Sequence, residues 1–136
     1  MMNPYDHYRK VATETADPVE LVIMLYRGAI NFLAGAEQAM HAGDPAQSHR
    51  LLIRAQLVVA ELMGTLDLDA GEIALNLNRL YDYMQRQMIE ANLRKDPAPA
   101  AEVRRMLVEL LGTWEDIAQQ QAAHGSPRAA SQIAVA

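Results

Sequence analysis

The sequence predicts an all-α protein, an antiparallel four-helix bundle with a short N-terminal cap segment or helix, and three observations support this prediction. Prolines fall at positions 4, 18, 45, 97, 99 and 127, and the long apolar-periodic runs between them contain none. Within those runs the apolar residues recur at three- and four-residue steps, which places them on one face of a helix. The connections are so short that consecutive helices must double back on one another.

Each predicted helix start has an acidic residue at its N-cap. Three starts also carry Glu or Gln three residues later: Asp17-Pro18-Val19-Glu20, Asp44-Pro45-Ala46-Gln47 and Asp69-Ala70-Gly71-Glu72. In such a capping box the acid accepts hydrogen bonds from the first-turn amides, and the later side chain reaches back to the N–H of the cap. Asp96-Pro97 begins the fourth helix in the same manner, and proline at the first helical position forfeits no hydrogen bond.

These signals divide the chain into three parts. Residues 1–16 form the cap segment, whose own pattern cannot bury a helix by itself. Residues 17–124 form the bundle, with helices expected at about 18–42, 45–66, 70–95 and 97–123. Residues 125–136 are rich in Ala, Ser, Gly and Gln, and we expect a disordered tail.

The helix predicted within residues 69–96 is the one around which we expect the others to be arranged. One apolar stripe runs along it: Ile73, Leu77, Leu80, Tyr81, Met84 and Met88. Tyr81 and Tyr83 lie about 200° apart around the helix axis. One tyrosine ring should therefore face the core while the other faces outward beside Met84, where it could contact a partner.

The other helices carry inner seams of their own, and Trp114 is expected in the core. The seams are Leu21, Leu25, Gly28, Phe32 and Ala36 in the first helix, Leu52, Ala55, Val59, Leu62 and Leu66 in the second, and Val103, Leu107, Leu110, Trp114 and Ile117 in the fourth. A second set of apolar residues remains: Ile23, Ile30, Leu33, Leu51, Val58, Met63, Leu75, Met106 and Leu111. Such wide stripes exceed the need of a four-helix core, so the surplus should be buried by oligomerisation or by another chain.

Composition narrows the class of function. The chain has 136 residues, no cysteine, and twelve Lys and Arg against seventeen Asp and Glu, for a formal net charge of −5. The length fits a single domain. The absence of cysteine fits a protein of a reducing compartment. The acidic balance argues against nucleic acid or anionic lipid as the main ligand. The N-terminus lacks the apolar core of a signal peptide, and no stretch reaches about 18 uncharged residues, so we expect a cytoplasmic protein without membrane insertion.

The sequence contains no recognisable catalytic or metal-binding pattern, so we expect no enzyme activity, no cofactor and no metal. A di-metal site in a bundle needs two Glu-x-x-His units and two further carboxylates, whereas Glu37 and His41 are spaced four apart. No Gly-x-Ser-x-Gly motif or Gly-rich phosphate loop occurs. The six methionines within the predicted helices each favour the core, but we expect one or two of the set to line a groove for a partner.

An ordered set of motifs runs through most of the chain. Glu20-Leu21-Val22-Ile23-Met24-Leu25-Tyr26-Arg27-Gly28-Ala29 follows Asp17-Pro18-Val19, and Gly71-Glu72-Ile73-Ala74 leads through Leu80-Tyr81-Asp82-Tyr83-Met84 to Glu90-Ala91-Asn92. With Tyr5 near the start and Trp114 near the end, this set resembles the FliS family of flagellin export chaperones. The resemblance covers roughly Tyr5 to Ile117.

The resemblance implies a cytoplasmic chaperone with two partners, the C-terminal segment of newly made flagellin and the flagellar type III export machinery. Such a chaperone prevents premature polymerisation of flagellin. An amphipathic client would dock by helix-in-groove contacts, and we expect the flagellin groove to be lined by Leu51, Val58, Leu75, Tyr83, Met106 and Leu111.

In similar proteins the N-terminal segment can cover the binding surface, and here Tyr5 and Tyr8 would form that cap and compete with the client. The main alternative is a self-associating helical scaffold or adaptor without a flagellin client. For the chain alone we expect a monomer or a weak homodimer.

Overall fold

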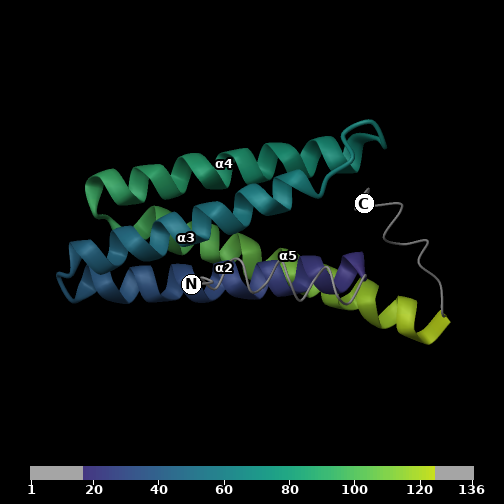
Figure 1. Cartoon of the computed structure of the whole chain (residues 1–136), viewed down its shortest axis with the longest axis horizontal. Helices are drawn as coiled ribbons and strands as arrows, with labels where there is room; N and C mark the ends of the chain where they lie inside the picture. The colour runs from purple at the N-terminus through teal and green to yellow at the C-terminus, as the bar shows by residue number, and fades with distance from the viewer. Residues whose placement is uncertain (1–16, 125–136) are drawn as a thin grey trace, which may run out of the picture.

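Within residues 17–124, the part of the chain that the computed structural model describes, four α-helices form an up-and-down bundle (Figure 1). The helices are α2 (Pro18–His41), α3 (Pro45–Gly64), α4 (Glu72–Arg94) and α5 (Pro97–His124). Helix α2 packs against α3 and α5, and α4 packs against the same two helices, so α2 and α4 occupy opposite corners. The predicted all-α bundle is confirmed. The cap segment and the tail lie outside the described residues.

Three of the four predicted N-caps are present. The Asp17 carboxylate accepts from the amides of Val19 at 3.0 Å and Glu20 at 3.4 Å. Asp44 accepts from the Gln47 amide at 3.1 Å, and Asp96 from the Ala98 amide at 2.9 Å. Each bond satisfies a first-turn donor that has no partner within the helix.

The predicted cap at Asp69 is wrong, because a turn occupies the residues expected to start the helix. The carboxylate of Asp67 accepts from the Asp69 amide, and the Asp67 carbonyl accepts from the Ala70 amide. Gly71 then serves as the N-cap with φ 137° and no side-chain hydrogen bond. Only glycine adopts this conformation at no steric cost. Helix α4 therefore begins at Glu72, two residues later than predicted.

The core is formed by one cluster of apolar side chains from all four helices. Its largest members include Tyr26, Leu33, Leu62, Tyr81, Met88 and Leu107. The hydroxyls of Tyr26 and Tyr81 share a buried hydrogen bond of 2.7 Å, which joins the two opposite corners of the bundle. The rings meet edge to face, and Trp114 packs against Tyr26 with ring centroids 6.4 Å apart. The prediction that Tyr81 and Trp114 are core residues is confirmed.

The structure changes the predicted boundary between core and surplus. Ile23, Leu33 and Val58 are buried, so they are core residues. Helix α2 uses a broad face because it packs against two neighbours. Conversely, Ile73 and Leu80 of the predicted inner stripe are exposed. Ile73 and Leu80 are seven residues apart and lie at the edge of the stripe. The buried part of the stripe consists of Leu77, Tyr81, Met84 and Met88.

Helix α2 is long and apolar enough, by length and composition alone, to cross a membrane. From the sequence, no stretch of about 18 uncharged residues was expected to span a membrane. Half of the most apolar 18-residue stretch of α2 is buried inside the bundle, where Leu25, Ala29 and Leu33 are core residues. The apolar character of α2 is thus explained by packing against α3 and α5.

Candidate partner-binding surface

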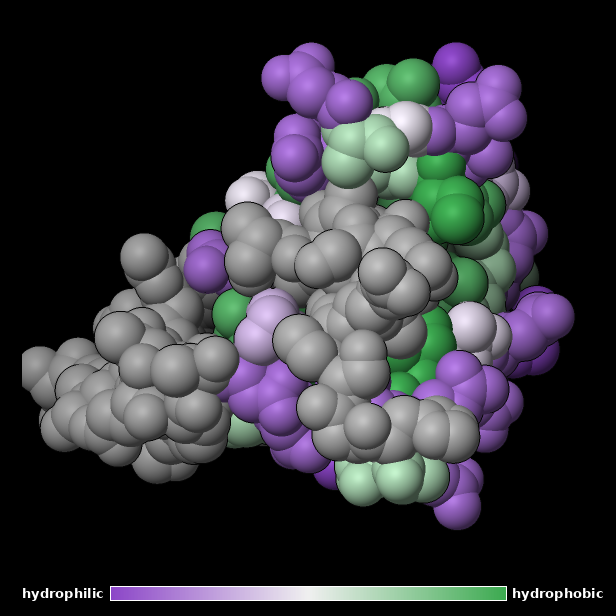
Figure 2. Space-filling view, turned by 90° about the vertical axis from the view of Figure 1, so that its right-hand side faces the viewer, coloured by the Kyte–Doolittle hydropathy of each residue, from purple (hydrophilic) through white to green (hydrophobic). Residues whose placement is uncertain are grey.

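Most of the large apolar side chains exposed in the described part of the chain belong to α4. Those of α4 are Ile73, Leu75, Leu80, Tyr83, Ile89 and Leu93, and the others are Ile53, Leu57, Leu68 and Val108. Leu93 is 78% exposed. In the view of Figure 2 hydrophobic side chains reach the surface between hydrophilic ones. We call the six exposed residues of α4 the α4 apolar surface. They lie on both flanks of the helix, and exposed apolar side chains gathered on one helix indicate a site of protein interaction.

The flank of α4 next to α3 forms an apolar groove. It has a volume of about 350 Å³ and is lined by Ile53, Ile89 and Leu93 together with His49, Gln56, Asn92 and Lys95. We call this the α3–α4 groove. Two interhelical hydrogen bonds hold its walls. The Asn92 side-chain amide bonds to the His49 ring at 2.8 Å, and the Gln85 side-chain amide donates to the backbone carbonyl of Gln56 at 2.8 Å. The polar bonds fix the spacing of the helices while the apolar side chains stay accessible.

The opposite flank of α4 faces α5. The Tyr83 hydroxyl donates to the Glu102 carboxylate, and the Gln87 side chain donates to the same carboxylate at 3.4 Å. The bond to Glu102 is the main reason that the pKa of Tyr83 is raised, since it favours the protonated hydroxyl. Tyr83 is 38% exposed, so its ring presents an apolar face to solvent while the hydroxyl is anchored. The predicted division between a core Tyr81 and an outward Tyr83 is confirmed.

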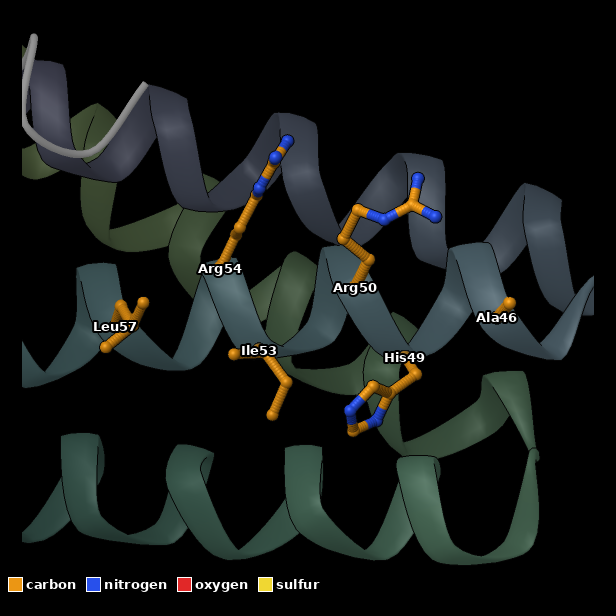
Figure 3. Close-up of a pocket in the computed structure, with 6 residues that line it drawn as sticks. All are labelled: Ala46, His49, Arg50, Ile53, Arg54 and Leu57. Carbon is orange, nitrogen blue, oxygen red and sulfur yellow. The ribbon is translucent and has the colours of Figure 1, made fainter. Parts of the chain in front are cut away.

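The outer face of α3 continues the α3–α4 groove. Figure 3 shows a depression lined by Ala46, His49, Arg50, Ile53, Arg54 and Leu57, with a volume of about 410 Å³. His49 and Ile53 point toward α4, whereas Arg50 and Arg54 project toward α2. The exposed side of α3 therefore has an apolar centre with a basic edge.

The residues predicted to line the flagellin groove do not gather on one surface. Val58 is fully buried, so its predicted place on an outer surface is wrong. It lies on the inner face of α3, where Ala55 and Leu62 are also buried. Leu51 is half-buried, and its Cδ1 lies only 2.9 Å from where a Cβ on Gly35 of α2 would be. This places Leu51 between α2 and α3.

The remaining predicted residues lie on separate flanks. Leu111 is one turn before Glu115, which pairs with Arg27 of α2, so it lies on the side of α5 that faces α2. Met106 is one turn after Glu102 and lies on the side that faces Tyr83. Leu75 and Tyr83 are exposed on α4. A partner-binding role for Leu51, Leu75, Tyr83, Met106 and Leu111 stays a prediction, and Tyr5 and Tyr8 lie outside the described residues.

Sequence reasoning missed four exposed apolar residues of the α3–α4 side. They are Ile53 and Leu57 on α3 and Ile89 and Leu93 on α4. Each pair is spaced four residues apart, so each forms a short stripe of its own, away from the core stripe of its helix. That spacing is visible in the sequence and could have identified them.

The methionines behave mainly as core residues. Met84 and Met88 are fully buried, and Met24, Met40, Met63 and Met106 are half-buried. Each of these six methionines is less exposed than the residues of the α4 apolar surface. A groove lined by methionines, as expected from the sequence, could therefore use only half-buried methionine side chains. A half-buried methionine such as Met106 contributes only an edge to the surface.

Glu37 and His41, the spaced pair noted in the sequence, differ in their surroundings. Both carboxylate oxygens of Glu37 accept from Arg104 of α5, at 2.5 and 3.2 Å, and this bond raises the pKa of Arg104. His41 is exposed at the end of α2. Among the described residues no group of three His, Asp or Glu side chains is placed to hold a metal ion.

These features define a helical bundle whose exposed grooves suit contact with another polypeptide. The family described as flagellar protein FliS matches residues 1–121, and this chain belongs to that family. It is 34% identical over 128 residues to the flagellar secretion chaperone FliS of Bacillus subtilis, covering 93% of this chain and 96% of the relative. It is 35% identical over 116 residues to the chaperone of the same name from Salmonella typhimurium, covering 81% and 86%. The flagellar secretion chaperone FliSB of Pseudomonas aeruginosa is 32% identical over 121 residues, covering 85% and 96%.

Proposed function

We propose that this protein is a cytoplasmic flagellar secretion chaperone that binds the C-terminal segment of flagellin on the α4 apolar surface and the adjoining α3–α4 groove. The observation that carries the proposal is the exposure of large apolar side chains on both flanks of α4, next to a groove whose walls are held by interhelical hydrogen bonds. The names of its relatives support the flagellar role.

The physical basis is the need to cover an amphipathic client. A segment that folds only within an assembled filament would otherwise expose its apolar face and associate with other copies. A helix-in-groove contact covers that face, with anchors spaced at three or four residues. Ordering such a segment costs about 2 to 5 kcal/mol, so the client must bury a large area. Exposed apolar residues along the whole length of α4, from Ile73 to Leu93, provide that area.

A bound client could neither polymerise early nor aggregate, which keeps it competent for the flagellar type III export machinery. Release at that machinery requires a complex that exchanges. A surface of half-exposed side chains around a preformed core suits this requirement, because the chaperone need not unfold to let the client go. The core residues Tyr26, Leu62 and Met88 would stay packed throughout.

Size-exclusion chromatography with light scattering tests the proposal. The chain is run alone and with a flagellin C-terminal fragment. We expect a one-to-one complex with the fragment and a monomer or weak dimer without it. A stable homo-oligomer that ignores the fragment would contradict the proposal and favour a self-associating scaffold.

Tyr83→Ala refines the test on the α5 side of α4. The substitution removes an exposed ring, so we expect weaker binding of the fragment with a melting temperature near that of the parent. Leu68→Ala, also exposed but in the turn before α4, is the matched control and should leave binding unchanged. A large loss of stability in Tyr83→Ala would mean that this ring supports the fold.

A further inference from the structure

Two arginines at the basic edge of α3 have no acidic partner within residues 17–124. Arg50 donates only to Gln47, one turn earlier, and Arg54 forms no ion pair among the described residues. The ion pairs found in that part of the chain use Arg27, Arg86, Arg94 and Arg104 instead. The chain has a formal net charge of −5, yet these two neighbouring guanidiniums have no carboxylate beside them in the described part of the chain. They can therefore pair with carboxylates of another molecule.

The position of these arginines relates them to the α3–α4 groove. Arg50 and Arg54 border the depression, which has Ile53 near its centre and Leu57 at one end (Figure 3). The opposite border is His49, which is also part of the α3–α4 groove. A helix lying over Ile53 would therefore have the arginines along one side and α4 along the other.

We propose that the helix received by the α3–α4 groove carries two carboxylates, four residues apart, that pair with Arg50 and Arg54. The arginines are themselves four residues apart, which corresponds to a rise of about 6 Å along α3. Acidic residues at the same spacing share one face of the docked helix and match that separation. The inference rests on the proposed function in that the groove receives a helix, and it adds the charge that this helix must present. The arginines thereby select the register and direction of the client.

Charge argues against other occupants. A symmetric dimer formed by this face would bring the basic edges of both copies into one interface, and the described residues that line the face include no carboxylate to pair with Arg50 and Arg54. Recognition of an anionic membrane typically uses clusters of about 4 to 8 basic residues, more than this edge supplies. A nucleic acid would meet the repulsion of the acidic chain as a whole.

The first experiment measures binding of two synthetic helical peptides by fluorescence anisotropy. Both carry the same leucine stripe; one has two Glu residues four apart beside it, and the other has Gln at those places. We expect the Glu peptide to bind about threefold to tenfold more tightly, the range for exposed and rim ion pairs. The difference should shrink as salt is raised, because added ions screen exposed charges.

The variants R50Q/R54Q and R50E/R54E identify the groups responsible. In R50Q/R54Q the preference for Glu should disappear, and in R50E/R54E a peptide with Lys at the two places should bind best. The matched control R79Q/R105Q removes the same charge from exposed positions on α4 and α5 and should keep the preference. Both arginine pairs are exposed or half-exposed, so no variant should unfold the bundle.

The outcomes separate this inference from the function that it builds on. Equal binding of the Glu and Gln peptides, or a preference that survives in R50Q/R54Q, overturns the inference alone, provided that the flagellin fragment binds. If neither peptide nor the fragment binds, the groove is no docking site and both proposals fail. Self-association lost in Ile53→Ser would assign the face to a second copy. Binding to phosphatidylglycerol vesicles that is lost in R50Q/R54Q would assign it to lipid.

Discussion

The hydrogen bond between Tyr26 and Tyr81 should be worth a measurable part of the stability of the bundle, because it is buried and joins its opposite corners. Tyr81→Phe leaves the Tyr26 hydroxyl without this partner, and Tyr26→Phe does the same to Tyr81. A buried hydroxyl that loses its partner costs about 1 to 3 kcal/mol. At roughly 4 °C per kcal/mol for a domain of this size, either variant should melt several degrees below the parent.

The double variant is the sharper test. In Tyr26→Phe/Tyr81→Phe no hydroxyl remains to be satisfied at this place, and the two rings keep their edge-to-face packing. We expect it to be no less stable than the worse of the single variants, so the two effects are far from additive. The assay is urea unfolding followed by circular dichroism. A double variant destabilised by the full sum of the two single effects would refute the reasoning.

The same tyrosines should make the bundle sensitive to alkali. Burial raises the pKa of Tyr26 from 10.0 to about 12 and also raises the pKa of Tyr81. A folded-state pKa above the unfolded value means that the stabilisation is fully present below pH 10 and is lost as the pH rises toward 12. The free energy of unfolding should fall above pH 10 by up to about 1.4 kcal/mol per pH unit for each tyrosine. In the double phenylalanine variant this part of the slope should vanish; an unchanged slope would contradict the assignment.

Two further predictions compare matched pairs of side chains in thermal unfolding. Val58→Ala removes buried methyl groups and should cost about 2 kcal/mol, whereas Leu57→Ala, at a side chain 44% exposed, should cost less than about 1 kcal/mol; similar losses would mean that Leu57 is also packed. Glu37→Gln weakens a partly buried bidentate pair and should cost about 1 kcal/mol, whereas Glu115→Gln weakens a more exposed pair and should cost at most about 0.5 kcal/mol. An equal or reversed order would contradict the role assigned to burial.

The sequence predicted the helices well because their boundaries depend on local chemistry. Asp17, Asp44 and Asp96 cap helices through bonds within three residues of the cap. The exception, Asp69, failed for an equally local reason, since the Asp67 turn and the left-handed Gly71 delay the start of α4. Two acids close together in one turn offer alternative caps, and the pattern alone does not choose between them.

The candidate surface was harder to predict, because exposure depends on which neighbours each helix meets. Val58 and Leu57 are adjacent in the sequence and similar in hydrophobicity, yet only Val58 faces the core. The two side chains point about 100° apart around α3, so Val58 is buried in the core while Leu57 faces away from it. Periodicity identified surplus apolar residues, but it could not assign each one to the core or to the surface.

The central claim, that the apolar residues beside the α3–α4 groove hold the client, is tested most directly by calorimetry with a flagellin C-terminal fragment. The test variant is Ile89→Ser/Leu93→Ser, and Val108→Ser, also exposed and on α5, is the control. Full burial of a side chain of this size contributes about 1.5 to 3 kcal/mol. We predict at least about tenfold weaker binding for the double variant and no change for the control. Unchanged affinity in Ile89→Ser/Leu93→Ser, with both proteins folded, would contradict the claim.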